Sequence, residues 1–189
     1  ARGGMSTQLA KEKFVCVDCE TTGLDTKADR IIEVAVIVFD FDGNIEEFET
    51  LVDPECEIPA SSIEIHHINQ EMVQGKPKIA EILPIVLKMI GRHTIIGHGV
   101  KFDIDMLVEA AKRESVPSAL EKNPSIDTLR LARLYGDSSS NALERLGNHF
   151  NVESDGAHRA MSDVKVNIEV FKHLTKKFKT TKQVFEALS

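Results

Sequence analysis

The chain contains no tryptophan and one tyrosine, so aromatic residues make up only 5% of its 189 residues. A protein that holds single-stranded nucleic acid by stacking bases on rings would therefore have to use its nine phenylalanines. No apolar run approaches the roughly 20 residues that cross a bilayer. The first residues also lack the apolar segment of a signal peptide. We therefore expect a cytoplasmic protein without a membrane partner.

Cysteine is scarce, with three residues in the chain. An odd number argues against a disulfide scaffold and fits a reducing compartment. Cys16 and Cys19 have the C-x-x-C spacing, but residues three apart on a strand point to opposite faces. We therefore expect no zinc or redox site at this pair.

Basic residues are outnumbered, 23 against 30 acidic ones, which gives a formal net charge of −7. A protein that binds long duplex DNA by its phosphates is usually basic, so a broad DNA-binding face is disfavoured. A small pocket that takes its positive charge from bound metal ions is compatible with this balance.

The length fits one domain. Residues 1–4, which precede Met5, are expected to be an expression scar. Residues 5–178 are expected to form a single domain, and residues 179–189 a C-terminal extension or the end of the last helix.

The hydrophobic pattern predicts three strands followed by alternating helices and strands. The expected strands are residues 13–19, 31–39, 45–52, 94–98 and 125–127. The expected helices are residues 78–90, 104–113, 128–134, 142–150 and 160–178. Residues 58–76 are expected to be irregular, with one helical turn near 70–73. This order predicts an α/β fold with one mixed five-stranded sheet flanked by helices.

The first expected strand leads into Asp18-Cys19-Glu20, which places two carboxylates at its carboxyl end. Because strand side chains alternate, Asp18 and Glu20 share one face. Ligands of open α/β sheets bind outside such edges. Two adjacent carboxylates repel each other unless a cation or a proton lies between them. The turn Thr21-Thr22-Gly23-Leu24 follows, and Leu24 in it is suited to wedge against a base.

Two further clusters follow other expected elements. His98-Gly99-Val100-Lys101-Phe102-Asp103 comes after a short strand and places Asp103 at the start of a helix. Taken alone, Asp103 has a structural explanation as a helix cap. Asp155-Gly156-Ala157-His158-Arg159-Ala160-Met161-Ser162-Asp163 leads into the last long helix, with His158 in the loop or first turn.

Four carboxylates and one histidine therefore fall at the ends of expected elements: Asp18, Glu20, Asp103, Asp163 and His158. Four hard oxygen ligands suit Mg²⁺ or Mn²⁺ rather than zinc. Two such ions about 4 Å apart stabilise an in-line displacement at phosphorus. A neutral histidine can accept the proton of the attacking water, because the ordinary pKa of histidine lies near working pH.

The three clusters together resemble the exonuclease motifs of the DEDDh family, and within it the epsilon-type proofreading exonucleases of bacterial DNA polymerase III. The resemblance covers residues 14–174, nearly the whole chain. Ile65-His66-His67-Ile68 is similar to the His-Gly-Ile element of the family, and Asp127-Thr128-Leu129 to its Asp-Thr element. The only tyrosine, Tyr135, is distant from Asp163, which excludes the relatives with tyrosine in the third motif.

The resemblance implies a ribonuclease H-like fold and the release of 5′-mononucleotides from a 3′ end. It implies that two Mg²⁺ or Mn²⁺ ions bind to Asp18, Glu20, Asp103 and Asp163, with Asp18 bridging both ions. It implies that His158 is the general base. It further implies that the 3′-terminal nucleotide contacts Thr21, Thr22, Leu24, His66, His98 and Phe102.

Two departures leave the substrate open. Gly99 stands where the family often has asparagine, and His67 where it tends to have glycine. The expected partner is a single-stranded or frayed DNA 3′ end, and the alternative is RNA, as for oligoribonuclease or ribonuclease T-like enzymes. A polymerase subunit or a sliding clamp is a further expected partner. Residues 183–188 resemble a sliding-clamp peptide, and the alternative for this segment is an ordinary helix end. A non-catalytic binding module is a third reading, against which the complete set of acids argues.

Overall fold

The computed structural model describes residues 8–154 and 158–189. The expected expression scar at residues 1–4 lies outside these ranges, and so do residues 155–157 of the third motif. The domain boundaries at residues 178 and 179 stay predictions. Within the described ranges, no helix combines the length and the apolar composition that a bilayer span requires.

A single mixed sheet of five strands forms the centre of the described part of the molecule, in the order β3-β2-β1-β4-β5. The strands are β1 (Phe14–Thr21), β2 (Ile31–Asp40), β3 (Gly43–Leu51), β4 (Thr94–Gly97) and β5 (Ser125–Asp127). β2 pairs antiparallel with β1 and β3, whereas β4 pairs parallel with β1 and β5. The predicted five-stranded mixed sheet is confirmed, and β1 is its central strand.

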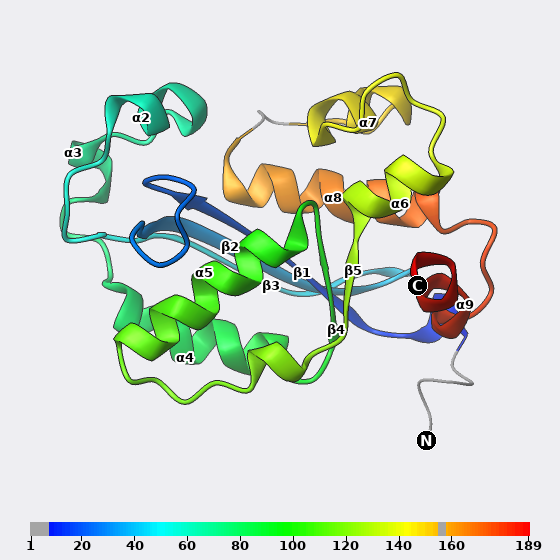
Figure 1. Cartoon of the computed structure of the whole chain (residues 1–189), viewed down its shortest axis with the longest axis horizontal. Helices are drawn as coiled ribbons and strands as arrows, with labels where there is room; N and C mark the ends of the chain where they lie inside the picture. The colour runs from blue at the N-terminus through cyan, green and yellow to red at the C-terminus, as the bar shows by residue number, and fades with distance from the viewer. Residues whose placement is uncertain (1–7, 155–157) are drawn as a thin grey trace.

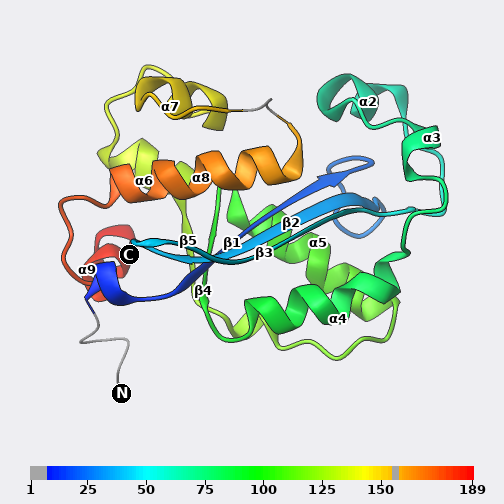
Figure 2. The same ribbon diagram turned by 180° about the vertical axis from the view of Figure 1, so that it is seen from behind.

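Helices cover both faces of this sheet (Figure 1). α8 (Ala160–Leu174) lies along one face against β1 and β2, and α6 (Thr128–Tyr135) and α7 (Leu143–His149) pack on it. α4 (Ile79–Ile90) and α5 (Val100–Arg113) cover the opposite face, as the view from behind shows (Figure 2). The other helical segments are η1 (Leu9–Lys11), α2 (Ala60–His66), α3 (Gln70–Val73), η2 (Leu120–Lys122) and α9 (Thr181–Leu188).

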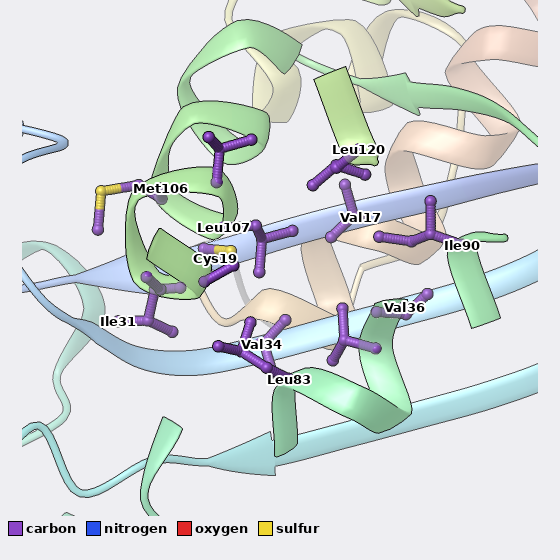
Figure 3. Packing of buried hydrophobic residues seen from close by; sticks show 14 of the residues in the cluster. Val17, Cys19, Ile31, Val34, Val36, Leu83, Ile90, Met106, Leu107 and Leu120 are labelled. Carbon is purple, nitrogen blue, oxygen red and sulfur yellow. The ribbon is translucent and has the colours of Figure 1, made fainter. Parts of the chain in front are cut away.

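Alternation along β1 separates two apolar cores. Val17 and Cys19 point toward α4 and α5, where they pack among the residues shown in Figure 3. Phe14 and Cys16 point toward α8 and belong to the second core. The two cysteines of the C-x-x-C therefore lie on opposite sides of the sheet, as the sequence predicts. The acids of β1 continue the face of Phe14 and Cys16, so they emerge on the side of α8.

Three helices differ from the expected ones. Residues 60–66 form α2 rather than an irregular segment, and α2 ends where His67 adopts a left-handed backbone with φ of 60°. α5 begins at Val100 instead of 104, because Gly99 takes φ of 72° and lets the strand turn directly into the helix. The last long helix stops at Leu174 instead of 178.

The C-terminal residues form a separate helix, α9, rather than an extension of α8. A capping box between Thr180 and Gln183 begins this helix. Val184 is fully buried in the second core. Leu9 donates its backbone N–H to the carbonyl of Lys179, just before α9, at 2.8 Å, and Thr181 of α9 donates its Oγ1 to Glu12 Oε1 at 2.7 Å, so this end of the chain also contacts the start of the described residues.

Candidate active site

Three carboxylates meet at the carboxyl end of the central strand. Asp18 and Glu20 project from β1, and Asp163 projects from the first turn of α8. One oxygen of each lies within 4.8 Å of the corresponding oxygens of the other two. This spacing fits a shared cation, because carboxylate oxygens are the ligands that Mg²⁺ and Mn²⁺ prefer.

Asp103, the fourth predicted ligand, is adjacent to this trio but outside it. It lies in the first turn of α5 and is 3% exposed. Its Oδ1 accepts a hydrogen bond from the backbone N–H of Cys19 at 2.9 Å, between the two acids of β1. The bond holds α5 against the strand that carries Asp18 and Glu20. The structure therefore brings three of the four predicted ligands together and ties the fourth to their backbone.

All four acids have raised pKa values, chiefly because they are buried. Burial raises the pKa of Asp18 well above its usual value, and the neighbouring carboxylates of Asp103 and Glu20 raise it further. Burial likewise raises the pKa of Glu20 to about 8, of Asp103 to about 8 and of Asp163 to about 6. A divalent cation would offset this repulsion.

Asp18 also supplies an independent indication of a bound cation. Its Oδ2 is buried and has no hydrogen-bond partner within the described residues. A buried carboxylate oxygen without a partner costs free energy unless something else binds it. The residues present therefore fit a divalent cation at Asp18, Glu20 and Asp163.

The raised pKa values predict how pH changes the stability of the metal-free protein. The folded state holds protons on Glu20 and Asp103 that the unfolded chain has already lost at neutral pH. Stability from these acids is therefore lost as pH rises through about 8. In chelator, we expect the melting temperature to fall as pH rises from about 5 to about 8 and to level off above about 8.5, by roughly 2–4 °C for each kcal/mol lost. Mn²⁺ should remove most of this fall, and a melting temperature that is flat over this range in chelator would contradict the assignment.

Hydrogen bonds inside the turn after β1, and others from α2, hold this turn in place. Thr21 Oγ1 donates to the carbonyl of Gly23 at 2.6 Å, and Thr22 Oγ1 donates to Asp29 Oδ1 at 2.9 Å. Both hydroxyls are thus engaged inside the turn. A Cβ on Gly23 would meet the carboxylate of Asp29, so a larger residue there would have to displace the acceptor of the Thr22 hydroxyl. Leu24 is 86% exposed at the tip, as its predicted role as a wedge requires.

His66 faces the turn after β1 rather than solvent. It is 2% exposed, and its Nδ1 accepts the backbone N–H of Ile68 at 3.0 Å. Its Nε2 therefore carries the proton and donates to the carbonyl of Thr21 at 3.3 Å. Ser62, one helical turn earlier, donates to the carbonyl of Thr22. In this structure α2 clamps the backbone of the turn, and Ser62 is a contact that the sequence did not reveal, since it lies in a segment expected to be irregular.

His98 and Phe102, both predicted to contact substrate, lie at the carboxyl end of β4. The ring nitrogens of His98 contact Thr128 Oγ1 at 2.8 Å and the carbonyl of Asn141 at 2.7 Å. Asp127 Oδ1 accepts the backbone N–H of Gly99 at 2.8 Å. Phe102 is partly buried against the core beneath α5. His98 thus connects β4 to α6 and to the segment before α7, a link that no sequence signal indicated.

His158, the predicted general base, stands immediately before α8. It is exposed and adopts a left-handed backbone with φ of 68°. Its backbone N–H contacts Asp163 Oδ1 at 3.2 Å. Arg159 is the N-cap residue, so His158 lies in the loop, as the sequence predicts. The structure therefore places the residue beside one of the three clustered carboxylates.

A mixed sheet with acids at the end of its central strand, faced by an acid from a long helix, defines a ribonuclease H-like nuclease fold. Residues 15–171 match the family model described as "Exonuclease", named RNase_T. The chain belongs to this exonuclease family, whose members depend on divalent metal ions.

Similar curated proteins carry DNA polymerase III names. Over 168 residues the chain is 32% identical to "DNA polymerase III subunit epsilon" of Aquifex aeolicus, covering 88% of this chain and 82% of that protein. Over 169 residues it is 34% identical to "DNA polymerase III PolC-type" of Clostridium perfringens, covering 89% of this chain. The chain spans only 12% of the length of that PolC-type protein.

Solved structures share the fold. One is E. coli exonuclease I in complex with a dT13 oligonucleotide, with a TM-score of 0.78 and 21% identity, covering 93% of this chain and 43% of that chain. Another is exonuclease X in complex with 5′ overhanging duplex DNA, with a TM-score of 0.72 and 21% identity, covering 93% of this chain and 99% of that chain. The predicted ribonuclease H-like fold is confirmed.

Proposed function

We propose that the protein is a 3′→5′ exonuclease that releases 5′-mononucleotides from DNA 3′ ends with two Mg²⁺ or Mn²⁺ ions, as in proofreading. The observation that carries this proposal is the convergence of Asp18, Glu20 and Asp163 within 4.8 Å, together with a buried oxygen of Asp18 that has no partner among the described residues. Membership of the exonuclease family supports the reaction class. The similarity to a DNA polymerase III epsilon subunit over most of both chains supports DNA as the substrate.

In this proposal the four acids hold the ions and His158 handles the proton. Bound cations supply charge stabilisation at the scissile phosphate and position the attacking water. Asp18, Glu20, Asp103 and Asp163 would hold these ions, with Asp18 shared between the two. His158 accepts one proton of the water as its oxygen bonds to phosphorus and the bond from phosphorus to the 3′ oxygen breaks. The exposed position of His158 lets it release that proton to solvent.

The terminal nucleotide lies, in this proposal, between the turn after β1 and the start of α5. Leu24 and Phe102 supply apolar contacts to the base and sugar. The threonine hydroxyls, the buried His66 and the partly buried His98 have partners within the protein, so they act on the nucleotide chiefly by shaping the pocket.

We propose a DNA polymerase subunit as the protein partner and the cytoplasm as the location. The name of the Aquifex aeolicus relative supports both. A sliding clamp stays an alternative partner. Val184 is buried, and Phe185 and Leu188 pack against the second core. A clamp contact through residues 183–188 would therefore require α9 to detach.

The substrate is tested by initial rates on four oligomers of equal sequence. We expect single-stranded DNA to be degraded faster than a matched duplex end, and a mismatched end faster than a matched one. Opening a matched terminus costs a few kcal/mol, and opening a mismatched terminus costs less. The net charge of −7 means that the protein gains little affinity from the phosphates of a duplex. Binding to a duplex therefore does little to offset the free energy of opening its end.

Two outcomes of this assay would overturn parts of the proposal. Faster cleavage of the matched duplex than of the single strand would contradict the frayed-end account. Faster cleavage of the RNA oligomer than of DNA would favour the RNA-trimming alternative.

A further inference from the structure

A buried acid outside the predicted ligand set lies next to the carboxylate cluster. Glu33 on β2 is directly opposite Glu20 on β1 in the antiparallel register. It is 4% exposed, on the same face of the sheet as Glu20. None of the sequence motifs includes it. Its negative charge also raises the pKa of Glu20 and of Asp163, so it is electrostatically part of the same neighbourhood.

Both oxygens of Glu33 are occupied by the residues that begin α8. Oε2 accepts Arg159 Nη2 at 2.7 Å and Nε at 3.2 Å. Oε1 accepts Arg159 Nε at 3.1 Å and the backbone N–H of Ala160 at 2.9 Å. The bonds to the guanidinium are fork-like and charge-assisted, the strongest class of hydrogen bond in proteins. The bond to Ala160 satisfies one of the N–H groups that the first turn of a helix leaves free.

These contacts fix the chain immediately after His158. Arg159 and Ala160 are held by Glu33, and the backbone N–H of His158 itself is held by Asp163. His158 sits between these two anchors with a left-handed backbone, a conformation that costs free energy for a residue other than glycine. A conformation of this kind persists only where the surrounding contacts hold it.

We propose that Glu33 and Arg159 are positioning residues for His158: the pair ties the start of α8 to β2 and so aims the imidazole at the carboxylate cluster. This inference rests on the proposed role of His158 as general base. Arg159 also neutralises Glu33, so the buried acid does not add a further unpaired charge beside Glu20. With both oxygens of Glu33 occupied, the pair acts through geometry and not as a metal ligand.

The test is a double-mutant cycle on single-stranded DNA. We expect His158→Ala to lower kcat by about 10² to 10⁴. We expect Arg159→Ala to lower kcat by about 10- to 100-fold with KM within about twofold, since a misplaced catalytic group can cost about 10²-fold. In the His158→Ala background, Arg159→Ala should change kcat by less than about twofold, because no base remains to be aimed. Arg159→Lys should recover only part of the rate, since lysine cannot form the fork.

Further variants separate positioning from folding and from metal binding. Arg130→Ala removes an exposed arginine of α6 and should leave kcat unchanged. The double variant Glu33→Gln, Arg159→Gln removes both charges at once, so the buried carboxylate is not left without its arginine. It should lower kcat as much as Arg159→Ala does. Mn²⁺ affinity, measured by calorimetry, should stay within about twofold in every variant of this pair.

The outcomes that overturn the inference differ from those that overturn the proposed function. If the losses of His158→Ala and Arg159→Ala multiply in the double variant, Arg159 acts independently of His158 and the inference is wrong. Weakened Mn²⁺ binding in Glu33→Gln with Arg159→Gln would make Glu33 part of the metal site and would also overturn it. If His158→Ala leaves kcat unchanged, the assignment of the base fails, and the inference fails with it.

Discussion

Asp18→Ala is expected to lower the rate of DNA hydrolysis by at least about a thousandfold. Asp18 has a buried oxygen without a partner in the part of the chain that the structure describes, and in the proposed site it would be shared by both cations. Without the metal ions the transition state loses several kcal/mol of charge stabilisation, so the activation free energy rises. Each 1.36 kcal/mol of this rise slows the reaction about tenfold. Initial rates on a single-stranded oligomer measure the effect, and Asp18→Asn should lose a similar amount.

The same substitution should leave the melting temperature unchanged or raise it. The carboxylates of Asp103, Glu20 and Asp163 all disfavour the charged form of Asp18, so removing that charge relieves repulsion in the metal-free protein. Asp105→Ala is a matched control, because Asp105 lies on α5 two residues after Asp103 and forms a surface ion pair with Lys101 at 3.2 Å. Full activity is expected in this control. A large fall in melting temperature in Asp18→Ala would show that Asp18 is a structural residue instead.

Excess chelator is expected to reduce hydrolysis to background, and Mg²⁺ or Mn²⁺ should restore it. The clustered carboxylates repel a phosphate unless cations intervene. Titration of the metal-free protein with Mn²⁺ should give two ions per chain. Because the pKa values of Glu20 and Asp103 are raised to about 8, binding at neutral pH should also release protons. Calorimetry in buffers of different ionisation enthalpy measures that release.

Three results would contradict this expectation in different ways. Undiminished hydrolysis in chelator would remove the metal from the mechanism. A stoichiometry of one ion would contradict the two-ion assignment while leaving metal dependence intact. Binding without proton release would show that the acids are already ionised in the metal-free protein.

The sequence by itself determined the order of most elements and the positions of the acids at the ends of those elements. β5 (Ser125–Asp127) and the turn α3 (Gln70–Val73) lie where the sequence predicts them, and most other elements agree within a few residues. The strands could be predicted because β1 and β2 are short apolar runs bounded by turn residues. The acids at the strand ends could be predicted because each motif is contiguous in the chain.

Local patterns were insufficient where packing decides the structure. α2 has apolar Ile63 packed on a small core, but its seven residues are too few for a helical period to show. The inward orientation of His66 follows from the docking of α2 on the turn after β1. A segment of seven residues is too short for the sequence pattern to show either where α2 begins and ends or which of its residues are buried.

Only the tertiary structure decided which residues hold the site in shape. The bond from Cys19 to Asp103 joins residues 84 positions apart, and the bonds from Arg159 to Glu33 join residues 126 positions apart. Glu33 looks in the sequence like one acid within an apolar strand, and nothing local shows that its partner is an arginine at the start of α8. Hydrophobic periodicity specifies which face of an element is buried, but it does not specify which side chains from distant elements meet there. The partners of Glu33 follow from the packing of α8 across β1 and β2, which brings the start of that helix to the end of the strand that carries Asp18 and Glu20.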